Sequence, residues 1–163
     1  MKKMKKILFG IAAFFFIIQI PLFTPERNET DAEPESDIAT AYDVPMDILM
    51  HLYNSCYDCH SNYTREYPWY YHIQPVSWWM NLHIQQAKKE LNFSEFANYP
   101  PEKATKKFEE IQEMMEERKM PLKSYLIMHQ DAKLSSEEYR DLTEWAIRMQ
   151  EELRHKKDSA QAL

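Results

Sequence analysis

Hydrophobic residues in much of the chain recur every three or four positions, which is the period of an amphipathic helix. The pattern predicts helices over about residues 45–56, 75–91 and 102–118, followed by a long final helix from Ser135. Each apolar stripe would bury one face of its helix. The positions expected to face the core are Ile48, Leu49 and Leu52 in the first helix, Val76, Trp79, His83 and Ala87 in the second, Phe108, Ile111 and Met115 in the third, and Tyr139, Leu142, Trp145, Ala146, Met149 and Leu153 in the last.

Short polar residues mark where these helices begin. Asp43 is the expected cap of the first helix, and Ser94 is the expected cap of a short helical turn that follows the second. A further short helical piece is predicted around residues 125–129. Ser135 and Glu138 have the spacing of a capping box, which places the start of the final helix.

The chain contains one glycine, Gly10, and it lies in the apolar N-terminal segment. A β-rich domain with tight hairpin turns normally uses glycine in those turns. The scarcity of glycine therefore favours helices joined by turns of Pro, Asn and Asp, and we expect an all-α domain.

The N-terminus has the pattern of an export signal. Lysines occupy positions 2, 3, 5 and 6, and residues 7–23 are almost entirely apolar. No small-x-small cleavage site follows, so we expect an uncleaved signal anchor over residues 1–23, with a cleaved signal peptide as the alternative. By the positive-inside rule the lysines stay in the cytoplasm. The rest of the chain would then lie on the periplasmic or extracytoplasmic side of the cytoplasmic membrane.

Composition divides the rest of the chain into three parts. Residues 24–43 are polar and acidic and contain prolines, so we expect a flexible tether there. The domain would span residues 44–155, and residues 156–163 would form a polar tail. The net charge is −6, and removing the four positive charges of the N-terminal lysines leaves −10 on the exported part. This acidity argues against nucleic acid as a partner and fits a protein with a basic docking surface, although the charges could simply solvate helix surfaces.

The two cysteines of the chain lie in the sequence Cys56-Tyr57-Asp58-Cys59-His60. This C-x-x-C-H pattern is the attachment signature of c-type haem. Two thiols three residues apart lie about one helical turn from each other, so both can form thioethers with the vinyl groups along one porphyrin edge. The imidazole of His60 then projects under the ring, where a neutral nitrogen can bind iron. We therefore predict one covalent haem c with His60 as a ligand.

Other uses of the two cysteines fit the pattern less well. A thioredoxin-like dithiol needs a strand–helix setting of the βαβ kind, and the sequence predicts none. A zinc site needs about four ligands, usually in two separated pairs. A disulfide across so short a loop would be strained. Haem is attached to this motif outside the bacterial cytoplasmic membrane, so the export signal supports the haem reading independently.

Several residues are candidates for the sixth iron position. Met120 has the best context, because it lies in a predicted break between helices and directly precedes Pro121, which stiffens the loop. His72 and His83 are the main alternatives, and an open position is the third. The remaining histidines considered are His129, which could instead donate to a haem propionate or a backbone group, and His51 and His155, which we expect to face solvent.

Motifs beyond C-x-x-C-H extend over about residues 48–150. They are Ser55–Asn62, Tyr67–Tyr70, Ile73–Trp78, Leu91–Ser94, Met120–Leu122 with Tyr125 and His129, and Leu134–Trp145. In these segments the chain resembles the bacterial haem-binding domain family of exported single-haem proteins. The resemblance implies covalent haem on Cys56 and Cys59 with His60 as proximal ligand, in a layout similar to cytochrome c domains. It implies no particular redox partner.

These expectations combine into a small cytochrome c-like helical domain around one covalent haem, after a membrane anchor and a tether. The leading hypothesis is an electron carrier rather than an enzyme, with His60 and Met120 as axial ligands and a separate redox protein as partner. One alternative is a peroxidase-like haem enzyme, which needs an open distal position with acid–base groups. Another is a haem-based redox or ligand sensor that signals through the anchor. Rapid binding of carbon monoxide to the ferrous protein would separate an open site from a six-coordinate carrier.

Overall fold

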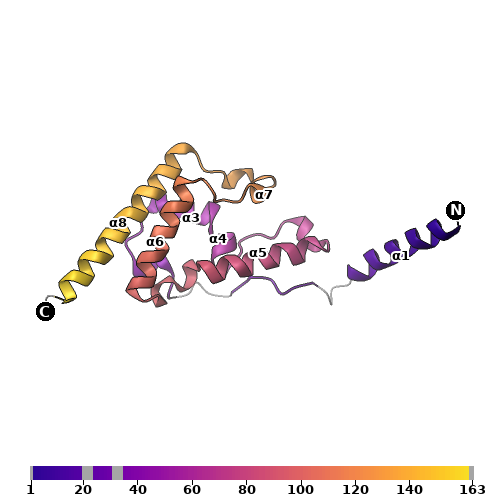
Figure 1. Cartoon of the computed structure of the whole chain (residues 1–163), viewed down its shortest axis with the longest axis horizontal. Coiled ribbons are helices and arrows are strands. Elements are labelled where there is room, and N and C mark those ends of the chain that lie inside the picture. Colours follow the sequence, from indigo (N-terminus) through magenta and orange to yellow (C-terminus); the bar gives the residue numbers. More distant parts are fainter. Residues whose placement is uncertain (1, 20–23, 31–34, 162–163) are drawn as a thin grey trace.

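The structure is a computed structural model that describes residues 2–19, 24–30 and 35–161, and within these ranges every regular element is a helix (Figure 1). The predicted all-α fold is therefore confirmed for the described chain. The elements in chain order are α1 (Lys2–Ile18), α2 (Ile38–Ala41), α3 (Met46–Ser55), α4 (Tyr57–His60), η2 (Trp69–His72), α5 (Val76–Glu90), η3 (Phe93–Asn98), α6 (Pro101–Glu116), α7 (Lys123–Leu126), η4 (Gln130–Ala132) and α8 (Ser136–Gln161).

The largest packed interface lies between α6 and α8, which run antiparallel and side by side (Figure 1). Trp145 of α8 is only 1% exposed, and its ring meets Phe108 of α6 edge-on with the centroids 5.4 Å apart. At the surface of the same pair, Arg154 forms an ion pair with Glu109 at 3.0 Å. Burial of the large apolar side chains is the main driving force that joins the two helices.

Most of the predicted inward positions are buried, but the prediction for α5 is wrong. Ser77 and Ile84 are the buried residues of α5, whereas Trp79 is 48% exposed. The hydroxyl of Ser77 donates to the side chain of Gln74, so a polar residue takes an inward place that the apolar pattern does not reveal. The predicted inward residues confirmed as buried are Ile48, Leu52, Phe108, Ile111, Met115, Leu142, Trp145, Ala146, Met149 and Leu153.

The start of α8 has the predicted capping box. The backbone N–H of Ser135 donates to Glu138 Oε2 at 2.6 Å, and the backbone N–H of Glu138 donates to Ser135 Oγ at 3.2 Å. The helix then continues to Gln161, so most of the segment predicted as a polar tail is helical.

Two other predicted caps are wrong. Pro45 directly precedes α3, so Asp43 lies too early to cap it. At η3 the cap is Asn92, whose side-chain oxygen accepts from the backbone N–H of Ser94 at 3.1 Å. At α3 the helix begins only after Pro45, and at η3 both Asn92 and Ser94 are of a residue type that can cap a helix. The pattern of residue types alone therefore does not fix the first helical residue.

The described part of residues 24–43 is packed against the domain. Ile38 is 0% exposed, and Asp37 caps α2 by accepting a backbone hydrogen bond of 2.9 Å. Asn28 is also buried, and its amide donates to the carbonyl of Ser61 at 2.9 Å. The flexible-tether prediction is therefore wrong for these residues, because one apolar anchor and specific hydrogen bonds outweigh the acidic composition.

Helix α1 contains most of the apolar run that was predicted to form a signal anchor. Directly after it, the side chain of Gln19 exchanges two hydrogen bonds with the backbone of Gln74, at 3.0 and 2.9 Å. No helix in the described part of the chain is both long enough and apolar enough to cross a bilayer. The run also includes residues 20–23, which lie outside the described residues, and the anchor stays a prediction.

Candidate functional site

The C-x-x-C-H motif forms a single helical turn directly after α3. Cys56 lies between α3 and α4, and its carbonyl accepts hydrogen bonds from the backbone N–H groups of Cys59 at 3.1 Å and His60 at 3.0 Å. This turn brings the two thiols and the imidazole together on one short segment. It is the local arrangement that attachment of a porphyrin edge by two thioethers requires.

Both cysteines are free thiols. Burial raises the pKa of Cys56 to about 12, with the neighbouring Cys59 as a second cause. Burial, followed by the charge of Asp58, raises the pKa of Cys59 to about 11. Catalytic dithiols in C-x-x-C motifs instead have a lowered thiol pKa, because the thiolate is the nucleophile. The environment of these two thiols therefore favours a neutral pair over a redox-active dithiol.

His60 is held by the backbone at the end of α5. Its Nδ1 lies 3.0 Å from the carbonyl oxygen of Leu91, so Nδ1–H donates this bond and Nε2 keeps its lone pair. Burial lowers the pKa of His60, and the neutral imidazole is therefore the favoured form at physiological pH. A carbonyl that fixes the tautomer and the ring orientation is the usual support of a metal-binding histidine.

Aromatic stacking fixes α4 against the rest of the domain. The ring of Tyr57 stacks on Phe93 of η3, with centroids 5.1 Å apart and planes 9° apart. The hydroxyl of Tyr57 donates to the carboxylate of Asp37 at 2.9 Å, and His60 meets the same Phe93 edge-on at 6.2 Å. Tyr57, the first residue between the two cysteines, thus holds the motif against α2 and η3.

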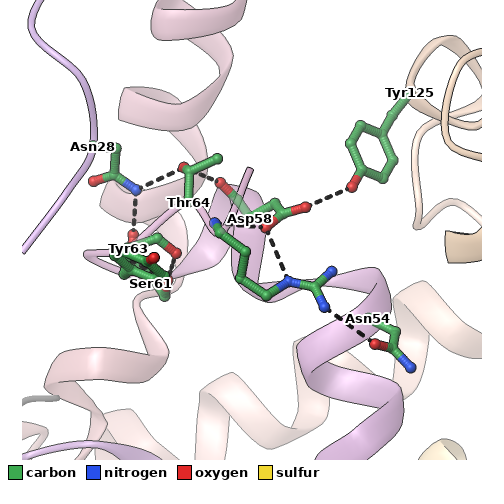
Figure 2. Close-up of polar contacts among 8 residues, drawn as sticks. Asn28, Asn54, Asp58, Ser61, Tyr63, Thr64 and Tyr125 are labelled. Atoms are coloured by element: carbon green, nitrogen blue, oxygen red, sulfur yellow. Dashed lines mark hydrogen bonds and ion pairs between the residues drawn. The ribbon is translucent and has the colours of Figure 1, made fainter. Parts of the chain in front are cut away.

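Asp58, the second residue between the cysteines, forms a polar network with residues of other segments (Figure 2). Its Oδ2 accepts from the hydroxyl of Tyr125 at 2.9 Å, and its Oδ1 accepts from the backbone N–H of Arg65 at 3.2 Å. Its carbonyl accepts from the hydroxyl of Thr64 at 2.7 Å. Burial, followed by Asp58, raises the pKa of Tyr125, which therefore stays a neutral donor.

Asn28 completes this network from the N-terminal segment (Figure 2). Its amide donates to the carbonyl of Ser61 at 2.9 Å and to the hydroxyl of Thr64 at 3.1 Å, and its oxygen accepts from Lys88 at 2.7 Å. Sequence reasoning missed this residue, because it lies in the acidic segment predicted as a tether. No periodicity or motif in that segment marks it.

Met120 lies in the turn after α6. Arg118, which follows the C-cap of α6, is in the left-handed region (φ 50°). The backbone N–H groups of Arg118 and Lys119 donate to the carbonyls of Met115 and Met114, as in a Schellman motif. The side chain of Met120 packs against the same core cluster as Cys56. Its carbonyl accepts from the hydroxyl of Tyr139 at 3.0 Å. These contacts place Met120 beside the apolar core, and its ligation of iron stays a prediction.

In the described part of the chain, the other histidines contact residues other than His60. The contacts are a 3.3 Å approach of His51 Nδ1 to Glu138, a ring contact of His72 with Tyr71, a hydrogen bond of His83 Nδ1 with the Trp79 carbonyl at 2.8 Å, and one of His129 Nε2 with the Tyr70 hydroxyl at 2.8 Å; His155 is exposed on α8.

Large apolar side chains are exposed on η2, α5 and the segment after Met120. Exposed groups of this kind mark surfaces that a ligand or a partner covers. The residues present fit haem, because the C-x-x-C-H turn brings two thiols and a neutral imidazole onto one short segment. The exposed fractions are 72% for Trp69, 38% for Trp78, 48% for Trp79, 54% for Leu82, 37% for Leu122, 71% for Ile127 and 55% for Met128.

Comparison with known protein families finds a match for most of the chain. The family model described as haem-binding domain matches residues 14–148, from within α1 to within α8. The matched range contains the C-x-x-C-H motif and Met120. No curated protein and no solved structure matches the chain.

Proposed function

The chain belongs to the family of haem-binding domains, and from this premise we propose that it is an exported c-type monohaem protein that transfers single electrons. In this proposal Cys56 and Cys59 hold the haem covalently, and His60 and Met120 are its axial ligands. When bound, the haem supplies an iron that changes its oxidation state by one electron. The protein's own residues attach it, orient it and set its surroundings.

The observation that carries the proposal is the hydrogen bond from His60 Nδ1 to the carbonyl of Leu91 at 3.0 Å. This bond leaves Nε2 as the nitrogen with a free lone pair and fixes the plane of the ring. The lowered pKa of His60 keeps that nitrogen unprotonated. The neutral thiols one helical turn away complete the set of groups that a C-x-x-C-H site uses.

The choice of Met120 rests on its surroundings. Tyr139 holds its carbonyl, the core cluster holds its side chain, and Pro121 follows it. A thioether paired with a histidine raises the reduction potential relative to two histidines. An electron carrier whose haem iron has both axial positions filled needs no acid–base groups beside the iron, whereas a haem enzyme needs them.

Export and the redox partner are supported by the sequence. The lysine-rich start and the apolar run after it are the pattern of an export signal, and c-type haem is attached outside the cytoplasmic membrane. We propose that the haem domain works on that side, with the N-terminal segment as its membrane attachment. The negative charge of the domain suits a redox partner with a basic docking surface.

Spectroscopy of the holo protein tests the proposal. Protein matured with covalent haem should show the weak near-infrared sulfur-to-iron band when oxidised, and the ferrous form should resist carbon monoxide. Met120→Ala should abolish the band, open the iron to carbon monoxide and lower the potential. Met128→Leu is the matched control, since Met128 is 55% exposed, and it should change none of these properties.

The outcomes separate the candidate functions. A wild-type spectrum retained in Met120→Ala would assign the sixth position to another residue, and His72→Ala and His83→Ala would identify it. Rapid carbon monoxide binding by the wild type would reject the carrier and favour a haem enzyme or sensor.

A further inference from the structure

Met120 packs against the core and Pro121 is buried, but the rest of the segment from Met120 to His129 is held mainly by polar contacts. Helix α7 lies in this segment, and none of its residues, all of which are described, is buried. Leu122, Ile127 and Met128 are also exposed. A segment with so little apolar burial opens locally at low cost, so individual hydrogen bonds decide where it lies.

One such bond joins this segment to the haem motif. Tyr125 of α7 donates its hydroxyl to Oδ2 of Asp58 at 2.9 Å (Figure 2). Asp58 lies between the two cysteines, and its side chain is only 15% exposed. A hydrogen bond to a charged, largely buried acceptor is stronger than one between neutral groups. Tyr125 therefore ties the segment directly to the residues that attach the haem.

A second contact joins the segment to η2. The ring of His129 stacks on that of Tyr125, with centroids 4.3 Å apart and planes 11° apart. Its Nε2 lies 2.8 Å from the hydroxyl of Tyr70 in η2. The four side chains form one continuous series of contacts from the haem motif, across the segment after Met120, to η2.

We propose that Asp58, Tyr125, His129 and Tyr70 form a clasp that holds the Met120 segment against the haem-attachment motif and so slows exchange of the sixth iron ligand. The inference rests on the proposed haem function and deepens it. Asp58 and Tyr125 act as positioning residues, because they restrain the segment and need not touch the iron. Opening of the clasp would free the segment and let an external ligand reach the iron.

The test uses the full-chain holo protein and the rate at which imidazole binds to its ferric form. Tyr125→Phe removes the hydroxyl and keeps the ring, and it should raise this rate about tenfold. Tyr63→Phe is the matched control, because Tyr63 is near the same motif but 45% exposed, and it should leave the rate within about twofold. An unchanged rate in Tyr125→Phe at full haem content would overturn the proposal.

Hydrogen exchange gives a readout that does not depend on iron chemistry. In Tyr125→Phe, amides of residues 122–129 should exchange faster, while those of residues 139–153 in α8 should not change. Asp58→Asn weakens the same bond and should act in the same direction by a smaller factor. Faster exchange throughout the domain would contradict a local clasp and indicate general destabilisation.

A double-mutant cycle tests whether the clasp is one unit. Tyr70→Phe alone should also speed imidazole binding, and the double variant with Tyr125→Phe should be little faster than the faster single variant. Independent, additive effects would overturn the four-residue clasp.

Failure of the clasp and failure of the proposed ligand set give different results. The wild-type near-infrared spectrum reports whether methionine binds the iron. The ratio of the Tyr125→Phe rate to the wild-type rate reports the clasp, even if the sixth position proves open, because the segment would still restrict access.

Discussion

The α6–α8 pair and the region around the haem motif are built on different principles. The pair is joined mainly by apolar packing, with Phe108 and Trp145 almost completely buried. The other region, made of η2, α5 and the segment after Met120, leaves large apolar side chains in solvent and is joined by hydrogen bonds through Asp58, Tyr125 and His129. One region can be stabilised by its own packing, whereas the other has a surface suited to a large apolar group.

This difference indicates where stability and function reside. Burial of apolar area stabilises the helix pair without any ligand. A haem attached at Cys56 and Cys59, as proposed, would add a large apolar group beside α4, and its binding would then be coupled to local order there. Changes to the pair should therefore act on folding, and changes around the motif should act on haem and its ligands.

The largest effect is expected from removal of Cys56 and Cys59, which we propose attach the haem. Cys56→Ala combined with Cys59→Ala should abolish haem that survives acid–acetone extraction and denaturing electrophoresis. Without haem, the η2, α5 and α7 region should lose hydrogen-exchange protection and near-ultraviolet circular dichroism before the α6–α8 pair does. A rigid, native-like haem-free domain would contradict this difference between the two regions, because haem would then contribute nothing to the order of η2, α5 and α7.

A substitution in each region compares their contributions to folding. Trp145→Ala should lower the free energy of unfolding of the holo protein by about 3–5 kcal/mol, because it opens a cavity between α6 and α8. Trp69→Ala is the same substitution at a 72% exposed position and should cost less than about 1 kcal/mol. Urea unfolding followed by far-ultraviolet circular dichroism measures both. Equal losses would show that the two regions fold with similar packing.

The capping box of α8 should contribute a smaller amount. Ser135→Ala removes the hydroxyl that accepts from the N–H of Glu138 and should destabilise the protein by about 1 kcal/mol. Ser159→Ala, at an exposed position near the other end of α8, is the control and should be close to neutral. The same urea titration measures both variants, and a loss in Ser159→Ala as large as that in Ser135→Ala would argue against a role for the cap.

The smallest effect is a pH dependence at the same helix start. The hydrogen bond from the Ser135 backbone lowers the pKa of Glu138 below its ordinary value of 4.5. A carboxyl with a lowered folded-state pKa stabilises above its unfolded pKa and loses that contribution as the pH falls through the folded value. The stability difference between wild type and Glu138→Gln should therefore shrink from pH 7 to pH 3. A difference that is constant with pH would show that the ionised carboxylate does not matter.

Local patterns were sufficient to predict the main helices, whereas the haem-attachment role of Cys56 and Cys59 stays a prediction. The apolar stripes of α3, α6 and α8 and the capping box at Ser135 are properties of neighbouring residues, and the structure has them. The pattern failed at α5, where a hydrogen bond from Ser77 to Gln74 replaces an apolar contact. It also failed for residues 24–43, where Ile38 and Asn28 find partners far along the chain.

The sequence by itself determined the helical class and the placing of Cys56, Cys59 and His60 on one helical turn, because spacing along one turn is a local property. Only the tertiary structure decided which carbonyl orients His60, and that Tyr125 bonds to Asp58 across 67 positions of the chain. It also decided that the acidic segment packs against the domain. Contacts between distant residues depend on how whole helices pack, and no local pattern of residue types encodes them.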